Sequence, residues 1–116
     1  MKSIILAILF VFSPVAAAQA PSGKWTGSAK PNVGQTSRCP ANMGFELVVK
    51  NGKLAGTLDF GERIQPFEAS VSADGKFETT FVNPQGHTVQ VTGKLDDTFS
   101  VVNPIRCGYD GVPLKR

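Results

Sequence analysis

The sequence contains little histidine, cysteine and charge, and each shortage excludes a class of function. One His in 116 residues excludes most His-dependent catalysis and most His-based metal sites. The two cysteines lack the CxxC spacing of zinc sites and dithiol redox centres. Charged residues make up 18% and the net charge is only +3, which is too little to indicate a nucleic-acid partner. We therefore expect no metal, no cofactor and no nucleic acid.

The first 18 residues have the layout of a secretory signal peptide. Lys2 provides a short positive region, an apolar run follows over residues 4–12, and Pro14 ends it. That run is too short to span a bilayer. Cleavage fits after Ala18 or after Ala20, and we favour Ala18 because proline follows the second site. We therefore expect a periplasmic or secreted protein of a Gram-negative bacterium, with no transmembrane segment after cleavage.

The chain that remains after cleavage is long enough for one small domain only. Removing 18 of 116 residues leaves 98, assigned here to a single domain over residues 19–116. We expect this domain to be a monomer.

The two cysteines are expected to form one structural disulfide. An exported chain meets an oxidising compartment, and Cys39 and Cys107 allow only one intramolecular pairing. Closing a loop of about 69 residues stabilises a fold by about 4 kcal/mol in the chain-entropy account. For a domain of this size that is a large share of the net stability.

Turn signals recur evenly after residue 50, about 11 residues apart, with short apolar segments between them. They fall at Asn51-Gly52, near residues 61–63, and at Asp74-Gly75, Gln85-Gly86 and Asp96-Asp97. Helical periodicity is absent after the leader. We expect eight strands, at about residues 24–30, 45–50, 53–60, 65–72, 76–82, 87–95, 98–103 and 107–115.

The expected hairpins agree on a single apolar face. Asn51-Gly52 predicts a two-residue turn of the primed type, and residues 73–75, 84–86 and 96–98 predict three-residue loops. The cross-strand pairs that follow are Val49 with Leu54, Phe77 with Val71, Phe67 with Phe81, Phe81 with Val89, and Leu95 with Phe99. Eight strands with one apolar face close most economically into a barrel. We therefore predict an all-β fold, an eight-stranded antiparallel up-and-down (meander) β-barrel of lipocalin-like or avidin-like architecture, with an open sandwich as the alternative.

The inward-facing set is mostly apolar and includes several small residues. Small inward residues either make room for Phe rings or leave space for a small apolar ligand, and the sequence leaves both open. The predicted set is Trp25, Gly27, Ala29, Phe45, Leu47, Val49, Leu54, Gly56, Leu58, Phe67, Ala69, Val71, Phe77, Thr79, Phe81, Val89, Val91, Gly93, Leu95, Phe99, Val101, Val112 and Leu114.

An up-and-down order brings the long loop 31–44 and the connections 60–65, 83–87 and 103–107 to one end of the fold, together with both cysteines. Loops on a rigid scaffold are common sites of function. We interpret this rim as a binding site for a polar or anionic small molecule or for a protein, the alternative being that its polar side chains only solvate loops. The candidate rim residues are Arg38, Arg63, His87, Arg106, Asn83 and Asn103.

The sequence offers no catalytic grouping. His87 flanks a turn, and no G-x-S-x-G motif is present to supply a nucleophile. The carboxylates Asp96 and Asp97 are neighbours at a hairpin tip, where a solvated turn is expected. We therefore expect that the protein is not an enzyme and has no catalytic residues.

Short motifs carry three resemblances to known proteins. Residues 23–27 (GKWTG) resemble the first strand of avidin-like barrels. A Trp near the mature N-terminus, here Trp25, also resembles periplasmic metalloprotease inhibitors, which act through an N-terminal segment, here residues 19–22. The broadest resemblance, over residues 25–27, 51–56 and 106–109, is to small exported proteobacterial β-barrel proteins of no established function, and it implies no activity.

These observations favour an exported, non-catalytic binding protein of the bacterial envelope that uses the loop rim beside the disulfide. Two alternatives stay open. One is a periplasmic protease inhibitor that acts through its N-terminal tail, and the other is a carrier of a small apolar ligand.

Overall fold

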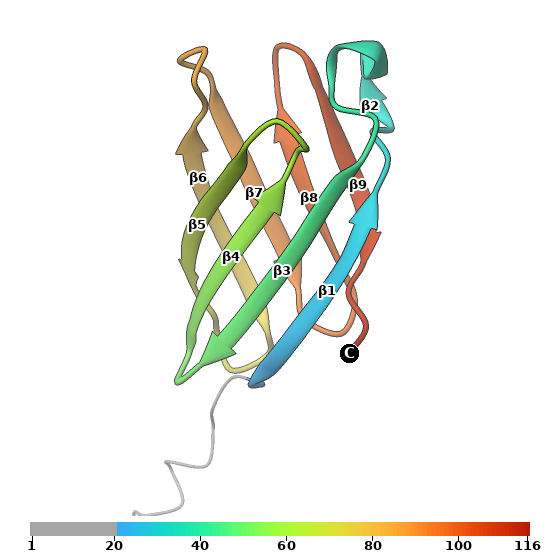
Figure 1. Cartoon of the computed structure of the whole chain (residues 1–116). Coiled ribbons are helices and arrows are strands. Elements are labelled where there is room, and N and C mark those ends of the chain that lie inside the picture. Colours follow the sequence, from blue (N-terminus) through green and yellow to red (C-terminus); the bar gives the residue numbers. More distant parts are fainter. Residues whose placement is uncertain (1–20) are drawn as a thin grey trace, which may run out of the picture.

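The computed structural model describes residues 21–116, so the expected signal peptide and its cleavage sites after Ala18 and Ala20 lie outside the described residues. The described part is all-β apart from one short 3₁₀ helix, and none of its helices is long and apolar enough to cross a membrane (Figure 1). The elements are β1 Gly23–Ala29, β2 Val33–Gly34, η2 Thr36–Arg38, β3 Met43–Lys50, β4 Lys53–Asp59, β5 Ile64–Ser70, β6 Lys76–Val82, β7 Thr88–Lys94, β8 Thr98–Asn103 and β9 Cys107–Pro113.

The strands form two antiparallel sheets whose inner faces pack together. The sheet orders are β1-β3-β4-β5 and β2-β9-β8-β7-β6, and a single bridge between Val71 and Phe77 links β5 to β6. The all-β antiparallel meander is therefore confirmed, and closure into one eight-stranded barrel stays a prediction.

One strand lies where a loop was expected. Within the predicted loop 31–44, β2 pairs with β9 and η2 follows it. Gly34 permits this pairing, because it adopts a positive φ of 69° and a Cβ there would lie 2.8 Å from the Arg106 carbonyl oxygen.

Three of the four predicted hairpin registers are confirmed, and the fourth is wrong. Val49 pairs with Leu54, Phe77 bridges to Val71, and Phe81 pairs with Val89. Phe99 was expected opposite Leu95 but lies opposite Gly93. The turn there begins at Lys94, whose carbonyl accepts from the Asp97 amide, and Asp96 takes a positive φ of 65°. The Phe67–Phe81 pair is absent from the ladders between residues 21 and 116.

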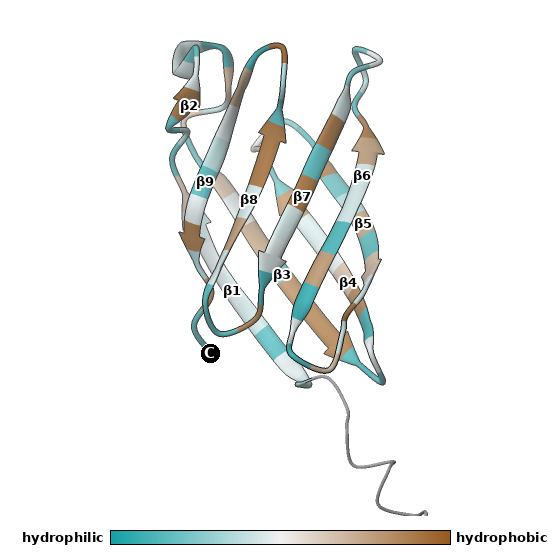
Figure 2. Cartoon of the chain, turned by 180° about the vertical axis from the view of Figure 1, so that it is seen from behind, coloured by the Kyte–Doolittle hydropathy of each residue, from teal (hydrophilic) through white to brown (hydrophobic). Residues whose placement is uncertain are grey.

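The alternating pattern places most of the predicted inward set in one core between the sheets. Hydrophobic and hydrophilic bands alternate along β7 in Figure 2, and Val89 and Val91 are buried while Gln90 is exposed. Phe45 and Phe99 join the two sheets through an edge-to-face contact with ring centroids 4.9 Å apart. Met43 and Tyr109 are also buried in this core, although they were not in the predicted set.

The inward glycines make room for aromatic rings. A Cβ on Gly56 would lie 2.3 Å from Cζ of Phe67, and a Cβ on Gly93 would lie 2.4 Å from Cβ of Phe99. Gly27 faces the Phe45 ring in the same way, although it is exposed on the edge strand β1 rather than buried as expected. At these three glycines, an aromatic side chain occupies the space that a larger residue would fill.

The two ends of the molecule differ as the meander predicted. Tight turns and both ends of the described chain lie at the lower end in Figure 1, and the longer connections lie at the upper end. The predicted Cys39–Cys107 disulfide is present at the upper end, with Cα atoms 5.9 Å apart. We call this the disulfide end, and we call the opposite end, with the tight turns, the turn end.

Candidate functional site

A cavity of about 510 Å³ lies at the disulfide end, between the loops of the two sheets. This volume falls within the range of about 300–1,000 Å³ that is usual for small-molecule sites. Its lining residues come from both sheets and from the segment after η2. They are Arg38, Cys39, Pro40, Ala41, Phe60, Glu62, Arg63, Phe81, Asn83, Gln85, Val89, Val101, Asn103, Arg106, Cys107 and Tyr109.

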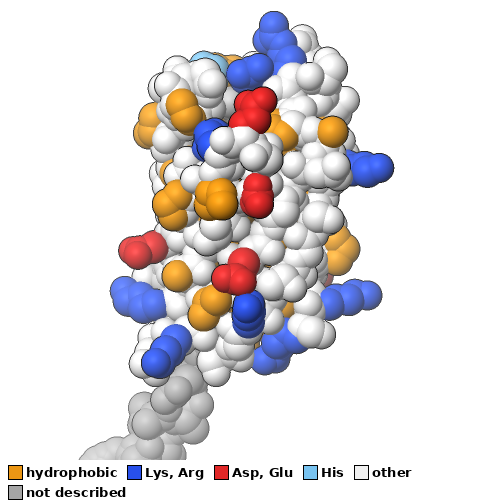
Figure 3. Space-filling view, viewed as in Figure 1, with side chains coloured by type: hydrophobic (Ala, Val, Ile, Leu, Met, Phe, Trp, Pro, Cys, Tyr) orange, Lys and Arg blue, Asp and Glu red, His pale blue; other side chains and the backbone are white. Residues whose placement is uncertain are grey.

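Three of the predicted rim residues are arginines, and all three line this cavity. Arg38 comes from η2, Arg63 from the β4–β5 loop and Arg106 from the β8–β9 connection. Figure 3 shows Lys or Arg side chains together with the single His at this upper end, although other cations lie at the lower end as well. The topology therefore brings together arginines that are far apart in the sequence.

Arg63 is held in place against an aromatic wall. Its guanidinium carbon lies 4.9 Å from the centroid of the Phe60 ring, and its Nη1 donates to Oε1 of Gln65 at 3.1 Å. The charge of Arg63 remains unneutralised by any carboxylate within residues 21–116, because the ion pairs there involve other cations.

Arg106 has a fixed backbone and a shielded side-chain donor. Its amide donates to the Asn103 carbonyl at 3.0 Å, and its carbonyl accepts from the Gln35 amide at 3.0 Å. The Nε atom is shielded from solvent and has no hydrogen-bond partner among the described residues. A buried donor without a partner is costly, and this one belongs to a residue of the cavity lining.

The three remaining predicted rim residues mainly stabilise turns. Oδ1 of Asn83 accepts from the backbone amides of Gln85 at 3.0 Å and His87 at 2.9 Å, which closes the β6–β7 turn. Oδ1 of Asn103 accepts from the Ile105 amide at 3.2 Å, and its Nδ2 contacts His87 Nδ1 at 3.3 Å. His87 is half-buried and is not among the residues that line the cavity.

Tyr109 forms a dry wall of the cavity next to the disulfide. It is 2% exposed, and its hydroxyl donates to the Pro40 carbonyl at 2.8 Å. Burial raises the pKa of Tyr109 from an ordinary value of 10.0 to about 12. The phenol therefore serves here as a neutral donor that ties the loop after η2 to β9.

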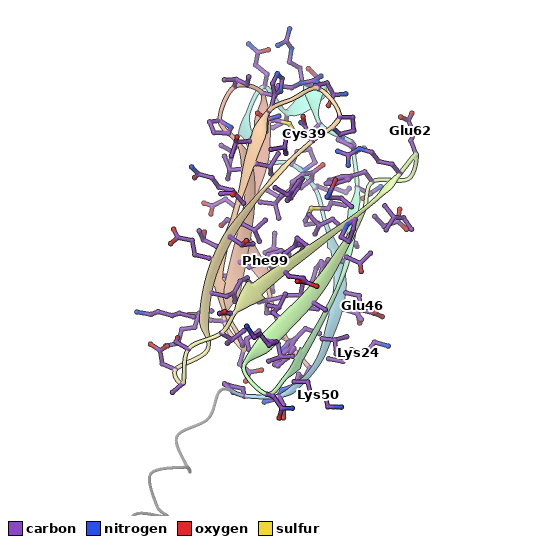
Figure 4. All side chains as sticks on the ribbon, turned by 90° about the vertical axis from the view of Figure 1, so that its left-hand side faces the viewer. Lys24, Cys39, Glu46, Lys50, Glu62 and Phe99 are labelled. Atoms are coloured by element: carbon purple, nitrogen blue, oxygen red, sulfur yellow. A yellow bond between two sulfur atoms is a disulfide. The ribbon has the colours of Figure 1, made fainter. Side chains whose placement is uncertain are left out.

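Sequence reasoning missed two residues that shape the cavity. Phe60 ends the predicted strand 53–60 in phase with the inward Leu54, Gly56 and Leu58, but it was left out of the predicted inward set; it lines the cavity, and its ring centroid lies 6.3 Å from that of Tyr109. Glu62 is the one carboxylate in the lining, and Figure 4 shows it at the tip of the β4–β5 loop, projecting away from the body of the molecule. For Phe60, the continued alternation of β4 was the available signal.

The arrangement combines an apolar interior with a cationic mouth. Within residues 21–116, no cluster of three or more His, Cys, Asp or Glu side chains could hold a metal ion. The cavity provides guanidinium donors, turn backbone and aromatic walls. Comparison with known proteins found no matching family model, no matching curated protein and no matching solved structure.

Proposed function

We propose that this chain is an exported, non-catalytic binding protein of the Gram-negative envelope that takes a small molecule into the cavity at the disulfide end. The observation that carries the proposal is the cavity of about 510 Å³, which reaches from three arginines at the rim to the buried Val89 and Val101. The signal-peptide layout of residues 1–18 supports export.

The cavity favours this proposal over inhibition by the N-terminal tail. Of the tail residues 19–22, the structure describes Pro21 and Ser22. The Ser22 carbonyl accepts from Nη1 of Arg116 at 2.8 Å, near the tight turns and far from the cavity. The geometry thus supports a ligand held by the rim, and it joins the polar rim and the apolar carrier hypotheses in one site.

A neutral apolar dye that becomes fluorescent in apolar surroundings, N-phenyl-1-naphthylamine, tests the proposal. We expect saturable binding of one dye per protein. Gln85→Trp should block it, because Gln85 is an exposed lining residue and a Trp ring there would occupy the mouth. Gln90→Trp is the matched control, since Gln90 is exposed on the outer face of β7. Absence of saturable binding, or equal loss in both variants, would contradict a binding cavity.

We also propose that the two sheets close around the cavity as one eight-stranded up-and-down barrel. The bridge between Val71 and Phe77 supports closure on one side. The bond from the Asn32 amide to the Gly108 carbonyl, at 2.9 Å, ties the β1–β2 connection to β9 on the other side. Nuclear Overhauser contacts between Phe67 and Phe81 would support closure, and their absence would leave a sandwich.

A further inference from the structure

We propose that the ligand of this cavity is an amphipathic anion, a carboxylate on an apolar body, and that Arg106 is its anchor. This inference rests on the proposed binding function and specifies the ligand class. It follows from three features of the cavity. The rim is positively charged, Arg106 is one of the lining residues, and the lining changes from polar at the rim to apolar inside.

The rim carries an excess of positive charge. Its ionised side chains are three arginines and Glu62, so the formal sum is +3 − 1 = +2. Glu62 projects outward from the loop tip, so it leaves the guanidinium groups unneutralised (Figure 4). The ion pairs within residues 21–116 are Lys24–Glu46, Lys76–Asp74 and Arg116–Asp96, all outside the cavity lining. A cavity with low-dielectric walls strengthens such a field, which favours an anion over a cation or a neutral group.

Arg106 provides the geometry that selects a carboxylate. Its Nε is a shielded donor without a partner among the described residues, and its backbone is held on both sides by Asn103 and Gln35. A carboxylate in the cavity can accept two parallel hydrogen bonds from the two Nη atoms of one guanidinium, while the shielded Nε stays covered. Such a ligand would bring the charge that the rim favours.

The inner part of the cavity fits an apolar body. Phe60 and Tyr109 face each other with centroids 6.3 Å apart, and the lining continues to Val89 and Val101, which are 5% and 3% exposed. A hydrocarbon chain that contacts these side chains leaves water, and each methylene that it buries favours binding. The head of the ligand would thus lie among the arginines and its body would lie against Val89 and Val101.

Three probes with a chain of eight carbons, together with acetate, separate the parts of this inference by isothermal titration calorimetry. They are octanoate, 1-octanol, octyltrimethylammonium and acetate. We expect octanoate to bind at least about tenfold more tightly than 1-octanol, because charge-assisted hydrogen bonds to arginine favour the carboxylate. The octyl cation and acetate should bind far more weakly, since one has the wrong charge and the other lacks the apolar body.

Substitution of Arg106 tests the anchor. We expect Arg106→Gln and Arg106→Lys each to weaken octanoate binding about tenfold while leaving 1-octanol binding unchanged, because neither side chain offers an arginine edge. Lys50→Gln is the control, since it removes one positive charge at the opposite end, where Figure 4 labels Lys50. If Arg106 variants fail to fold, Arg38→Gln and Arg63→Gln should each weaken octanoate binding severalfold by lowering the rim charge.

The outcomes separate the two proposals. Equal affinities for octanoate and 1-octanol would overturn the anion inference. An Arg106→Lys variant that keeps full octanoate affinity would overturn Arg106 as the anchor, and either result would leave the binding function intact. Binding of acetate as tight as that of octanoate would reduce the site to a simple anion site and overturn the amphipathic part. Failure of all octyl probes together with the naphthylamine dye would overturn the proposed function itself.

Discussion

The two ends of the molecule are built from the same antiparallel sheets, but their interiors are packed differently. Towards the tight turns, inward glycines meet aromatic rings, as Gly93 meets Phe77 and Phe99, and the hollow there is an open one at the surface beside Val71. At the disulfide end, Phe60 and Tyr109, with ring centroids 6.3 Å apart, line a more enclosed cavity. We propose a division of roles in which the turn end packs the core and the disulfide end holds the binding cavity.

The ends also differ in how their polar groups are satisfied. At the turn end, Asp96 accepts hydrogen bonds from Trp25 and pairs with Arg116, so the cation there has a partner. At the disulfide end, Arg106 Nε is shielded and has no hydrogen-bond partner within residues 21–116. Buried polar groups are normally satisfied, so the two ends differ in how completely their donors are paired.

Removing the disulfide should have the largest effect. We expect Cys39→Ala combined with Cys107→Ala to lower the free energy of unfolding by about 4 kcal/mol, because the unfolded chain regains its loop entropy. Urea unfolding monitored by far-UV circular dichroism measures this loss. The native state should loosen first at the disulfide end.

Amide hydrogen exchange locates that loosening. The amides of Gln35 and Arg38, which donate to Arg106 and Gln35 carbonyls, should exchange much faster in the double variant. The amide of Val71, which donates to Gly52 at the turn end, should change only with global stability. Equal acceleration at both ends would contradict the division of roles.

Filling the packed interior further should have the next largest effect. We expect Gly56→Ala to destabilise the fold by about 1–3 kcal/mol, because its Cβ would lie 2.3 Å from the Phe67 ring. Gly44→Ala is the matched control, since a Cβ there meets its nearest atom at an ordinary 3.5 Å. Thermal unfolding compares the two variants.

Enlarging a buried side chain should be tolerated beside the cavity. Val89→Ile adds one methyl group at a lining position, where space is available, so we expect a change below about 1 kcal/mol. A cost for Val89→Ile equal to that for Gly56→Ala would show that the cavity end is as tightly packed as the rest.

Tyr109 gives a third test, because it is the only tyrosine of the chain. Burial raises its pKa to about 12, so ultraviolet absorbance should show phenol ionisation near pH 12 in the folded protein and near the ordinary 10.0 in urea. Stability linked to the neutral phenol is full below pH 10 and is lost as the pH rises through 12. Tyr109→Phe should remove this alkaline loss, and ionisation near 10 in the folded protein would contradict a dry cavity wall.

Local turn chemistry explains which parts of the fold could be predicted. Asn51 and Gly52 both adopt positive φ, as a primed two-residue turn requires, and the register of β3 and β4 followed from them. The turn before β8 was placed wrongly because its positive φ falls on Asp96 rather than on a glycine, and Asp96 and Asp97 look alike in the sequence. Turns without glycine are therefore where sequence-based register prediction fails here.

The candidate site was predicted at the level of topology but not of side-chain contacts. An up-and-down order was enough to bring Arg38, Arg63 and Arg106 to one end. The role of Asn83 in closing its own turn depends on hydrogen-bond geometry, which no residue pattern specifies. Phe60 continues the inward alternation of β4, but its contact with Tyr109 was not predicted, because a residue pattern does not specify contacts between a loop and a strand.

The smallest expected effect concerns acid stability at the turn end. Hydrogen bonds from Trp25 Nε1 and then from Arg116 hold the pKa of Asp96 below its ordinary value of 3.8. A lowered pKa in the folded state means that ionised Asp96 stabilises the fold above pH 3.8, and that this contribution is lost as the pH falls through the lower folded value. Asp96→Asn should therefore melt at a slightly lower temperature than wild type at pH 7 and at nearly the same temperature at pH 2, and Asn also tolerates the positive φ at this position.

Asp97→Asn is the control, because Asp97 is exposed and has no ion pair among the described residues. A difference in melting temperature between Asp96→Asn and wild type that stays constant from pH 7 to pH 2 would contradict this prediction. It would show that the contribution of Asp96 to stability depends on the geometry of its contacts and not on its charge.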